Sequence, residues 1–582
     1  MLSILVNWLY TGVLVFLCGT ALIQGYKKLI KIVDKEVKRI EFGVIHIFFT
    51  GILGTTLYAQ VFSLFYRVNI ESNILLIILL AVYGIIQRGY LREQILSWIR
   101  KPRFLPENKR LRSKERWLRS LFWFSIIAAV FAFALSSSGT AKLIDTDWYH
   151  AQTIRWIEEY GCVKGVANLF PALGYNNAQH YFDALFSLNW AFGQSIRGSG
   201  GFFGLLMFIH GIQRVFQWKK HSRHMADALA LWEVAYSIIV TAFFADPYVD
   251  TLPNVLTLFI MTEWLAHLEE QKENIAELGF YSLLAVFAAV CKMSVAMVVL
   301  LAFHPACLLM KQKKVPQILL FLGLGILIAL PFLITNVVTT GYLIYLLSAV
   351  DLFEVNWKMD IEILKYSVDS MVAFARMPLA TMEEALNSGL KWIPVWFKAE
   401  SISHQLLYIT ILAFVLYDIL MTLGSLLKKE KIPLQMLWPR ICVYLGLVYW
   451  FITIPQVKYC WAFLIIPVAV IPVYYWEKGK HTWIKGGMLA AALGLFVMYG
   501  GFYSLRTLGY MKDGILHYPV MQADYGRYDF EAVKKDEHTF YVRKENGDIA
   551  CGYYVFPYLD NRQLLDSLVV GESLGDGFYL EK

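Results

Sequence analysis

Long apolar runs recur along the chain of 582 residues, and short polar or basic segments separate them. Most of these runs have about 17 to 25 residues, which is long enough to cross roughly 30 Å of hydrocarbon as a helix. The pattern predicts fourteen spans, at residues 2–23, 42–66, 73–87, 120–137, 200–217, 226–245, 251–267, 278–291, 293–310, 316–336, 405–426, 437–454, 459–476 and 486–503. The expected fold class is therefore an all-α polytopic membrane protein.

The composition agrees with this pattern. Hydrophobic residues make up 58% of the chain and charged residues 17%, whereas a soluble globular protein carries roughly 25% charge. The formal net charge of +8 does not point to nucleic acid, because the basic residues gather between apolar runs, where they orient a membrane protein. The seven cysteines show no CxxC spacing, and whether Cys162 pairs with Cys551 is left open.

Basic clusters predict the orientation of the chain in a cell membrane. Eleven Lys or Arg side chains lie between Arg88 and Arg119, which places this segment in the cytoplasm by the positive-inside rule. Alternation from that anchor places both termini outside the cell. It also exposes three larger outer segments, at 139–199, 339–404 and 504–582. The same alternation puts every other basic cluster inside: Lys27–Arg39, Lys219–Arg223, Lys311–Lys314, Lys428–Lys431 and Lys478–Lys485.

The first outer segment carries an acidic motif, Asp145-Thr-Asp147-Trp-Tyr149-His150, a few residues beyond the fourth predicted span. Carboxylates so close to hydrocarbon are costly unless a partner or a wet cavity compensates them. One interpretation is a helix cap, with Asp145 or Asp147 accepting from the first turn of a helix that runs through Ile154 to Tyr160. Another is a site for Mg²⁺ or Mn²⁺ formed by the two carboxylates and His150, and metal dependence stays open.

The remainder of this segment suggests a catalytic loop. Residues 151–160 and 177–190 predict two short amphipathic helices of the kind that lie in the membrane interface. A long outer loop of this kind, introduced by an acidic pair, resembles the first outer loop of GT-C class glycosyltransferases. The spacing from Asp145 to Tyr149-His150 resembles the D-x-x-x-Y-H pattern of a bacterial branch of that class. The resemblance implies a lipid-linked sugar donor, a catalytic base at Asp145 with Asp147 and His150 as further catalytic candidates, and a cavity lined by Tyr149.

Three further positions between residues 120 and 503 fit the same resemblance. Asp250 opens a predicted span in Asp-Thr-Leu-Pro, which is similar to a D-L-P element and implies a cavity-lining role, although the residue also suits a helix cap. Lys292 stands at the turn between two short predicted spans. Lys458 precedes a later predicted span, and at this second position that branch more often has arginine. The resemblance implies that both lysines bind the donor phosphate, and each also suits a snorkelling or topological residue.

Three regions are expected along the chain. Residues 1–119 form three helices and a basic loop, residues 120–503 form the GT-C-like membrane region, and residues 504–582 form a small α+β or β cap on the outer face. The outer segment 339–404 is expected to contain interfacial helices. Residues 539–556 predict a β-hairpin that turns at Glu545-Asn-Gly547.

These observations favour an integral membrane glycosyltransferase, and the resemblance implies that it inverts the configuration of the anomeric carbon. It would transfer a sugar from a polyprenyl-phosphate carrier to a hydroxyl of a glycan, lipid or protein acceptor at the outer face, in the modification of cell-envelope glycans or glycoconjugates. Membrane lipids are its other expected partners. The alternatives are a transporter or flippase for lipid-linked or anionic solutes, in which the lysines bind phosphate and the aspartates couple ions, and a non-catalytic assembly subunit.

The first prediction concerns orientation. Single cysteines replacing Arg103 and Asp147 in a cysteine-free background should react differently with a membrane-impermeant maleimide added to intact cells. We expect labelling at position 147 and protection at position 103, because every basic cluster agrees with one orientation. The reverse labelling pattern would remove the outer-face chemistry together with the topology.

Overall fold

The computed structural model describes residues 1–37, 40–100, 112–218, 223–271, 274–429, 434–477, 482–545 and 547–581. Parts of five of the six predicted cytoplasmic basic clusters, and Asn546 of the predicted hairpin turn, lie outside these residues. Within them the protein is predominantly helical, which confirms the all-α class, and a small strand region follows at the C-terminal end.

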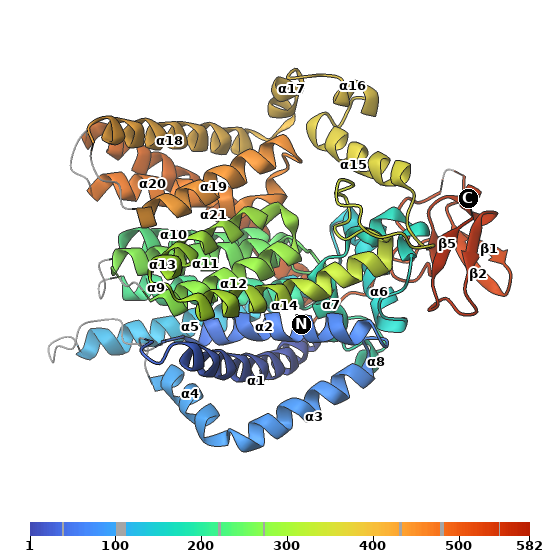
Figure 1. Cartoon of the computed structure of the whole chain (residues 1–582), viewed down its shortest axis with the longest axis horizontal. Coiled ribbons are helices and arrows are strands. Elements are labelled where there is room, and N and C mark those ends of the chain that lie inside the picture. Colours follow the sequence, from blue (N-terminus) through green and yellow to red (C-terminus); the bar gives the residue numbers. More distant parts are fainter. Residues whose placement is uncertain are drawn as a thin grey trace.

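Each of the fourteen predicted segments coincides with helical structure. The long helices that match these segments are stacked one above another in Figure 1. They are α1 (Leu2–Val33), α2 (Val44–Ser63), α3 (Ile70–Ile86), α5 (Arg112–Ser137), α9 (Ser199–Gln217), α10 (His224–Ile239), α11 (Thr251–Glu269), α12 (Ile275–Cys291), the 3-10 helix η6 (Met293–Ala302) with α13 (Phe303–Lys311), α14 (Val315–Thr340), α18 (Ile402–Leu427), α19 (Leu434–Ile452), α20 (Trp461–Glu477) and α21 (Thr482–His517).

Fewer than fourteen of these helices qualify as membrane spans by length and composition. Eight helices in the described part of the chain are long and apolar enough, or nine if α3 and α4 (Arg88–Arg100), bent by 84°, form one broken span. Three further apolar helices are shorter, namely α12, α19 and α20. The helices α9 and α11 do not qualify, and both carry charged side chains.

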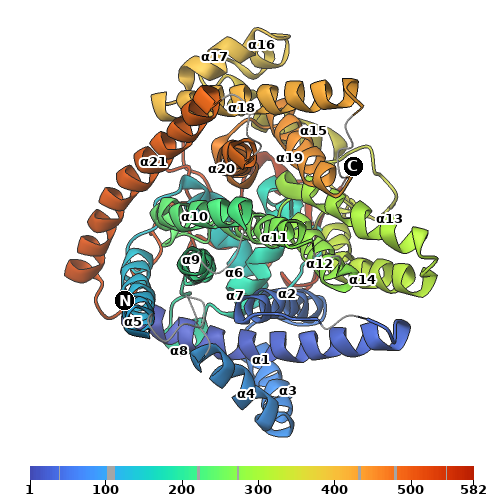
Figure 2. The same ribbon diagram turned by 90° about the vertical axis from the view of Figure 1, so that its left-hand side faces the viewer.

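The centre of the bundle is formed by α9, α10, α11 and α20, with α1, α14, α18 and α21 around them (Figure 2). Nearly every residue of α11 is buried, as expected for a helix that is surrounded by other helices. At the periphery α1 and α2 approach so closely that Gly19 and Gly51 lie against each other's helix backbone. Small residues permit this close packing, which is typical of membrane helices.

Short helices form the two outer segments. The first contains η2 (Thr146–His150), α6 (Ala151–Glu159), η3 (Val166–Asn168), η4 (Pro171–Tyr175), α7 (Ala178–Leu185) and α8 (Asn189–Phe192), and the second contains α15 (Ile361–Arg376), α16 (Met382–Leu386) and α17 (Trp392–Ala399). The two predicted amphipathic helices therefore exist as α6 and α7. However, every residue of α7 is buried, so its interpretation as an interfacial helix is wrong. Its polar residues face protein partners that the sequence pattern does not reveal.

The C-terminal strands form two small sheets. The first has the order β1 (Glu531–Lys535), β2 (His538–Val542), β3 (Tyr558–Leu559), with β1 antiparallel and β3 parallel to β2, and β4 (Leu568–Val570) pairs with β5 (Phe578–Leu580) in the second. The predicted hairpin over 539–556 is wrong. The antiparallel partner of β2 is β1, and the chain turns at Asp536, whose φ of 54° makes the two-residue connection possible.

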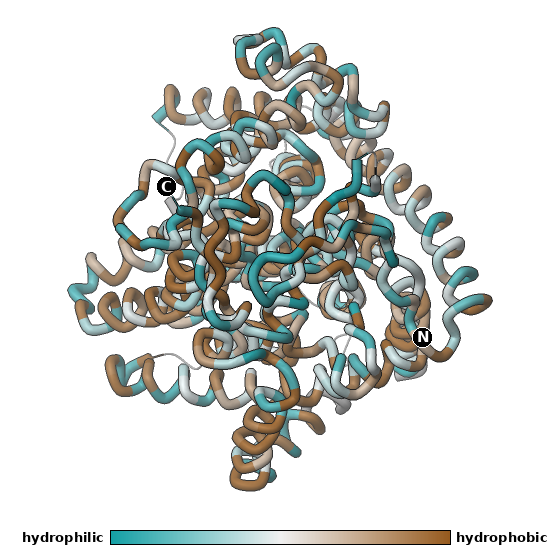
Figure 3. The backbone as a smooth tube through the Cα atoms, turned by 90° about the vertical axis from the view of Figure 1, so that its right-hand side faces the viewer, coloured by the Kyte–Doolittle hydropathy of each residue, from teal (hydrophilic) through white to brown (hydrophobic). Residues whose placement is uncertain are grey.

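This strand region, which we call the cap, shares one hydrophobic core with the first outer segment. Trp156 and Phe170 from that segment pack with Phe540, Tyr558 and Phe578 of the cap. Figure 3 views this end of the protein, where a largely hydrophilic chain lies in front of hydrophobic helices. The cap and the loop that carries the acidic motif at Asp145, which we call the acidic loop, therefore form a single unit. Some 380 residues separate them in the sequence.

The α1–α2 contact gives the second prediction. A Cβ at Gly19 would overlap the carbonyl oxygen of Ile47, whereas a Cβ at Gly25 of the same helix meets nothing within 4 Å. Gly19→Ala should lower the free energy of unfolding by about 1 to 3 kcal/mol through overpacking. Gly25→Ala is the matched control and should be neutral or stabilising by up to about 1 kcal/mol. Thermal unfolding of the detergent-purified variants measures the difference, and equal stability of the two would contradict the close approach.

Candidate active site

The first predicted site residue, Asp145, is paired with Lys458. Asp145 directly precedes η2, and Lys458 lies in the single turn η7 (Val457–Tyr459) between α19 and α20. The Lys458 Nζ donates to Asp145 Oδ2 at 2.8 Å, and both side chains remain partly exposed. The contact joins residues 313 positions apart, so the tertiary fold alone brings the two motifs together.

A second ion pair lies beside the first. Lys292 ends α12 and Asp250 immediately precedes α11, and Lys292 Nζ approaches Asp250 Oδ1 to 2.5 Å. Asp250 is only 2% exposed, so this pair is the more deeply buried of the two. Asn254 holds the surrounding backbone by donating to the Asp250 carbonyl and accepting from the Ala462 N–H, both at 2.8 Å.

One aromatic ring connects the two ion pairs. Tyr459 presents its ring to both ammonium groups, with the centroid 4.3 Å from Lys292 Nζ and 5.1 Å from Lys458 Nζ, within the range of cation–π attraction. The four charged residues that the sequence selected from separate motifs therefore lie together. We refer to Asp145, Asp250, Lys292 and Lys458 as the charged cluster.

A third carboxylate, Asp246, orients the acidic loop. Its Oδ1 accepts hydrogen bonds from the Lys142 and Leu143 N–H groups and from the Thr146 hydroxyl, at 2.9, 3.1 and 2.7 Å. Asp145 stands at the N-cap position of η2, yet its side chain makes no capping hydrogen bond. The capping interpretation of Asp145 is therefore wrong, and Asp246, from a distant segment, holds the chain just before η2 and the Thr146 hydroxyl.

The two aspartates of the motif point to different neighbours. Asp147 accepts from the hydroxyl of Tyr528 in the cap at 2.7 Å, and its carbonyl accepts from the Gly552 N–H at 2.6 Å. Residues two apart on a helical turn do not face the same side, which explains the divergence. Asp145, Asp147 and His150 thus share no cation site. Among the residues that the structure describes, no group of three or more His, Cys, Asp and Glu side chains is placed to hold a metal ion.

His150 faces another histidine. Its Nδ1 lies 2.8 Å from His180 Nε2, and both rings are buried. Burial, His180 and the two lysines hold the pKa of His150 well below its usual 6.5, and burial together with Lys292 lowers the pKa of His180 to about 3. Burial, which is the largest cause, and the nearby ammonium groups both favour the neutral form of the two imidazoles.

Tyrosines form the walls around the charged cluster. Tyr149 packs edge-on against Tyr175 with ring centroids 5.3 Å apart, and it lies close enough to Asp145 and Asp250 to interact electrostatically with both. Tyr248 is also close enough to Asp250 and Asp145 to interact electrostatically with both. Tyr175, Tyr248 and His180 were not predicted as site residues. The sequence signal for Tyr248 was its position between two carboxylates, in Asp246-Pro-Tyr-Val-Asp250.

An apolar cavity of about 650 Å³ adjoins the Lys458 turn. It lies between α17, α18, α19 and α20, and aromatic and aliphatic side chains line it. Two of the lining tryptophans hold the chain that leads to Lys458: Trp396 Nε1 donates to the Pro455 carbonyl and Trp450 Nε1 to the Gln456 carbonyl, both at 2.8 Å. The cavity wall is therefore hydrogen-bonded to the segment that leads to Lys458.

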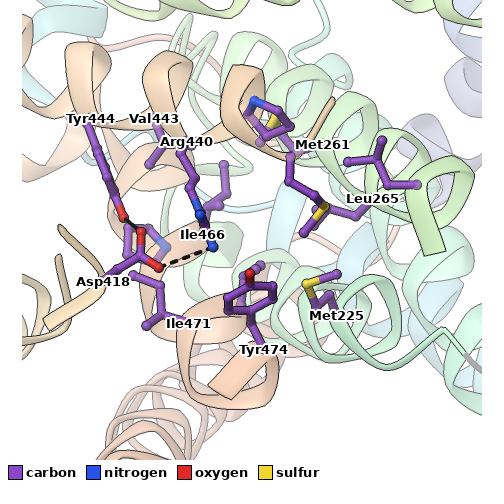
Figure 4. A pocket seen from close by; sticks show the side chains of 15 residues that line it. Met225, Met261, Leu265, Asp418, Arg440, Val443, Tyr444, Ile466, Ile471 and Tyr474 are labelled. Atoms are coloured by element: carbon purple, nitrogen blue, oxygen red, sulfur yellow. Dashed lines mark hydrogen bonds and ion pairs between the residues drawn. The ribbon is translucent and has the colours of Figure 1, made fainter. Parts of the chain in front are cut away.

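A second, smaller pocket lies toward the opposite end of α20 and contains a buried ion pair (Figure 4). Asp418 is 1% exposed there and accepts from the hydroxyls of Tyr444 and Tyr475 at 2.5 and 2.8 Å, with an Arg440 guanidinium nitrogen 3.3 Å away. The space is only about 50 Å³ and is otherwise lined by methionine and aliphatic side chains. These charges compensate one another, and the pocket is separate from the charged cluster.

A family model described as a domain of unknown function, DUF8201, matches residues 1–465. The chain belongs to this family. No curated protein and no solved structure matches it. All four residues of the charged cluster lie within the part of the chain that matches DUF8201, whereas the strands of the cap lie beyond it.

Close to the site, the buried carboxyl of Glu158 on α6 gives the third prediction. It accepts from Ser195 Oγ and Tyr553 OH, and burial raises its pKa from 4.5 to about 7. Between these values the folded protein holds a proton that the unfolded chain has lost, so the free energy of unfolding falls as pH rises, by up to about 3 kcal/mol. Glu158→Gln should remove this contribution.

Thermal unfolding of wild type and Glu158→Gln between pH 5 and pH 8 measures the effect. The stability of the variant relative to wild type should increase with pH through this window and level off above pH 7. A constant difference between the two proteins would show that Glu158 is ionised at all these pH values.

Proposed function

We propose that this protein is an integral membrane glycosyltransferase of the GT-C type that uses a polyprenyl-phosphate-linked sugar as donor. The observation that carries the proposal is the charged cluster, in which a carboxylate from the acidic loop lies beside two lysines from the ends of distant helices. A glycosyl transfer of this kind needs a base for the acceptor and cations for the departing phosphate within one site.

The two lysines suit a phosphate. The ammonium groups of Lys292 and Lys458 converge on Tyr459 from different helices, so one anion between them can accept hydrogen bonds from both. Negative charge on the phosphate grows as its bond to the sugar breaks, and fixed cations in a poorly hydrated site favour that change. This arrangement also gives Lys292 a use beyond snorkelling, since it turns inward to a carboxylate instead of outward to water.

The apolar cavity suits the carrier lipid. Its volume and apolar lining match a hydrocarbon chain better than a sugar, and its wall is hydrogen-bonded to the segment that carries Lys458. A donor placed with its prenyl chain between α18 and α19 would bring its phosphate toward the charged cluster. The helix α17 lines this cavity and contacts α15, so this part of the chain fits the lid or acceptor surface expected for the second outer segment.

Asp145 is the candidate base. It is the more exposed carboxylate of the cluster, so an acceptor hydroxyl can reach it from the outer face. Accepting the hydroxyl proton as the new glycosidic bond forms makes the acceptor a stronger nucleophile, while the sugar passes through an oxocarbenium-like state. Inversion at the anomeric carbon follows from the resemblance to GT-C enzymes.

A transporter is the second candidate, and a separate group of buried charges favours it. His210 lies between Glu233 and Glu263, with contacts of 2.7 and 2.8 Å, and Arg214 contacts Glu263 at 2.9 Å. His46 Nε2 lies 3.8 Å from a carboxylate oxygen of Glu263. These residues, the His/Glu network, lie on α2, α9, α10 and α11. Ionisable groups inside a helix bundle are a recurring feature of proton-coupled carriers.

The fourth prediction tests the enzymatic proposal through Asp145→Asn. This isosteric change removes the base but keeps the shape, so release of prenyl phosphate from polyprenyl-phosphate sugars should fall by roughly 10² to 10⁴. The assay uses purified protein in proteoliposomes with a panel of radiolabelled synthetic donors and acceptors. Melting temperatures establish that the variant is folded.

Two matched variants sharpen this test. Asp529→Asn alters a carboxylate that is 81% exposed on the cap and should retain full turnover. Asp147→Asn alters the neighbouring aspartate that faces Tyr528. Full turnover in Asp145→Asn with loss in Asp147→Asn would move the base to Asp147. Donor-independent proton or solute flux in wild type, lost on Glu263→Gln, would instead favour the transporter.

A further inference from the structure

Neither lysine of the charged cluster is available to a phosphate as the structure stands. Lys458 is hydrogen-bonded to Asp145 at 2.8 Å, and Lys292 is paired with Asp250 at 2.5 Å. Two positive charges are thereby matched by two negative charges in a site that is largely removed from water. A phosphate that enters this site meets no net positive charge and has to displace an existing partner from at least one lysine.

We propose that Asp145 and Asp250 are the resting counter-ions of the two lysines, and that the phosphate headgroup of the donor takes their place, so that donor binding frees Asp145. This inference rests on the proposed function, because it assigns the order of events at the same site. The donor binds first, the ion pairs exchange partners, and the carboxylate needed for the acceptor is released only afterwards.

The geometry favours the exchange. Each carboxylate reaches one lysine, whereas a phosphate has several acceptor oxygens and can bind both ammonium groups that lie against the Tyr459 ring. Lysine suits such an exchange, because its ammonium is a point charge on a flexible stem and does not hold a carboxylate in a bidentate fork. Both ion pairs can therefore open without moving the backbone of α11, α12 or α20.

The two carboxylates differ in their exposure. Asp250 is 2% exposed, so it stays buried and out of reach of an acceptor when Lys292 moves toward a phosphate. Asp145 has no capping bond on η2, and Lys458 is its donor among the described side chains. Once Lys458 leaves, Asp145 faces the outer opening with an unshared carboxylate, which is the state that a base requires.

The resting pair also protects the site. Oδ2 of Asp145 already accepts a hydrogen bond from the Lys458 ammonium at 2.8 Å, so this oxygen is engaged before a donor arrives and is not free for an acceptor hydroxyl. Each released carboxylate also repels the bound phosphate, so the affinity for the donor phosphate should be limited by the same two aspartates.

The experiment measures the affinity of the full-length protein in detergent for geranyl phosphate, a short prenyl monophosphate, by isothermal titration calorimetry. Removing one competing carboxylate should tighten binding. Asp145→Asn is therefore expected to lower the Kd by about tenfold, because one screened negative charge near the bound phosphate is removed. Asp250→Asn should act in the same direction. If the buried change in Asp250→Asn prevents folding, Asp145→Asn alone decides the outcome.

Control variants separate this inference from the proposed function. Lys292→Met and Lys458→Met should each weaken the binding of geranyl phosphate by tenfold or more, and neither should change the binding of geraniol, which lacks the phosphate. Asp529→Asn on the cap should leave both affinities unchanged. These lysine variants establish whether the cluster binds phosphate at all.

Three outcomes are distinct. Tighter binding in Asp145→Asn together with weaker binding in the lysine variants supports the exchange. Unchanged or weaker binding in Asp145→Asn, with weaker binding in the lysine variants, overturns the exchange and leaves the phosphate site in place. Unchanged binding in both lysine variants overturns the phosphate site, and the proposed donor and the exchange fail together.

Discussion

The neutralisation of buried charge where α11 begins and α12 ends is the constraint on which the site depends. Asp250 and Lys292 would each be costly alone in a poorly hydrated environment, and together they are stable only if their atoms stay within ion-pair distance. That requirement fixes the start of α11 against the end of α12. Asn254 then links α11 to the start of α20 and so to Lys458, which reaches Asp145.

The acidic loop is held from two sides. Asp246 holds its start from within the bundle, and the cap holds its middle through Tyr528 and Gly552. Asp145 therefore faces the helix bundle and Asp147 faces the cap. Gln152 extends the contact by donating to the Gly552 and Val555 carbonyls at 2.7 Å. A side chain whose loop is held in this way has little conformational entropy left to lose, which suits the role of base proposed for Asp145.

The sequence was sufficient for features that depend on local pattern and insufficient for those that depend on distant partners. Apolar periodicity located every long helix, because burial in a bundle or in lipid requires the same composition. The four residues of the charged cluster were selected from separate motifs. By contrast, the partner of Asp145 is Lys458, 313 positions away, and no local pattern indicates it. The chain does turn at Glu545-Asn-Gly547, where the Gly547 N–H donates to the Lys544 carbonyl at 2.9 Å, but β2 pairs with β1 before this turn and not with the residues after it.

Polar residues also explain why α11 does not qualify as a membrane span by length and composition, and α12 is in addition short. The charged cluster lies at one end of α11 and α12, and Glu263 and Glu277 lie toward the other end of the same helices. With 19 and 17 residues these helices are about 28 and 26 Å long, close to the roughly 30 Å of a hydrocarbon core. A helix with charged groups toward both of its ends is necessarily less apolar than one whose surface faces lipid. The helices α11 and α12 can carry such groups because other helices bury most of their residues, whereas α14 and α18 expose many apolar side chains.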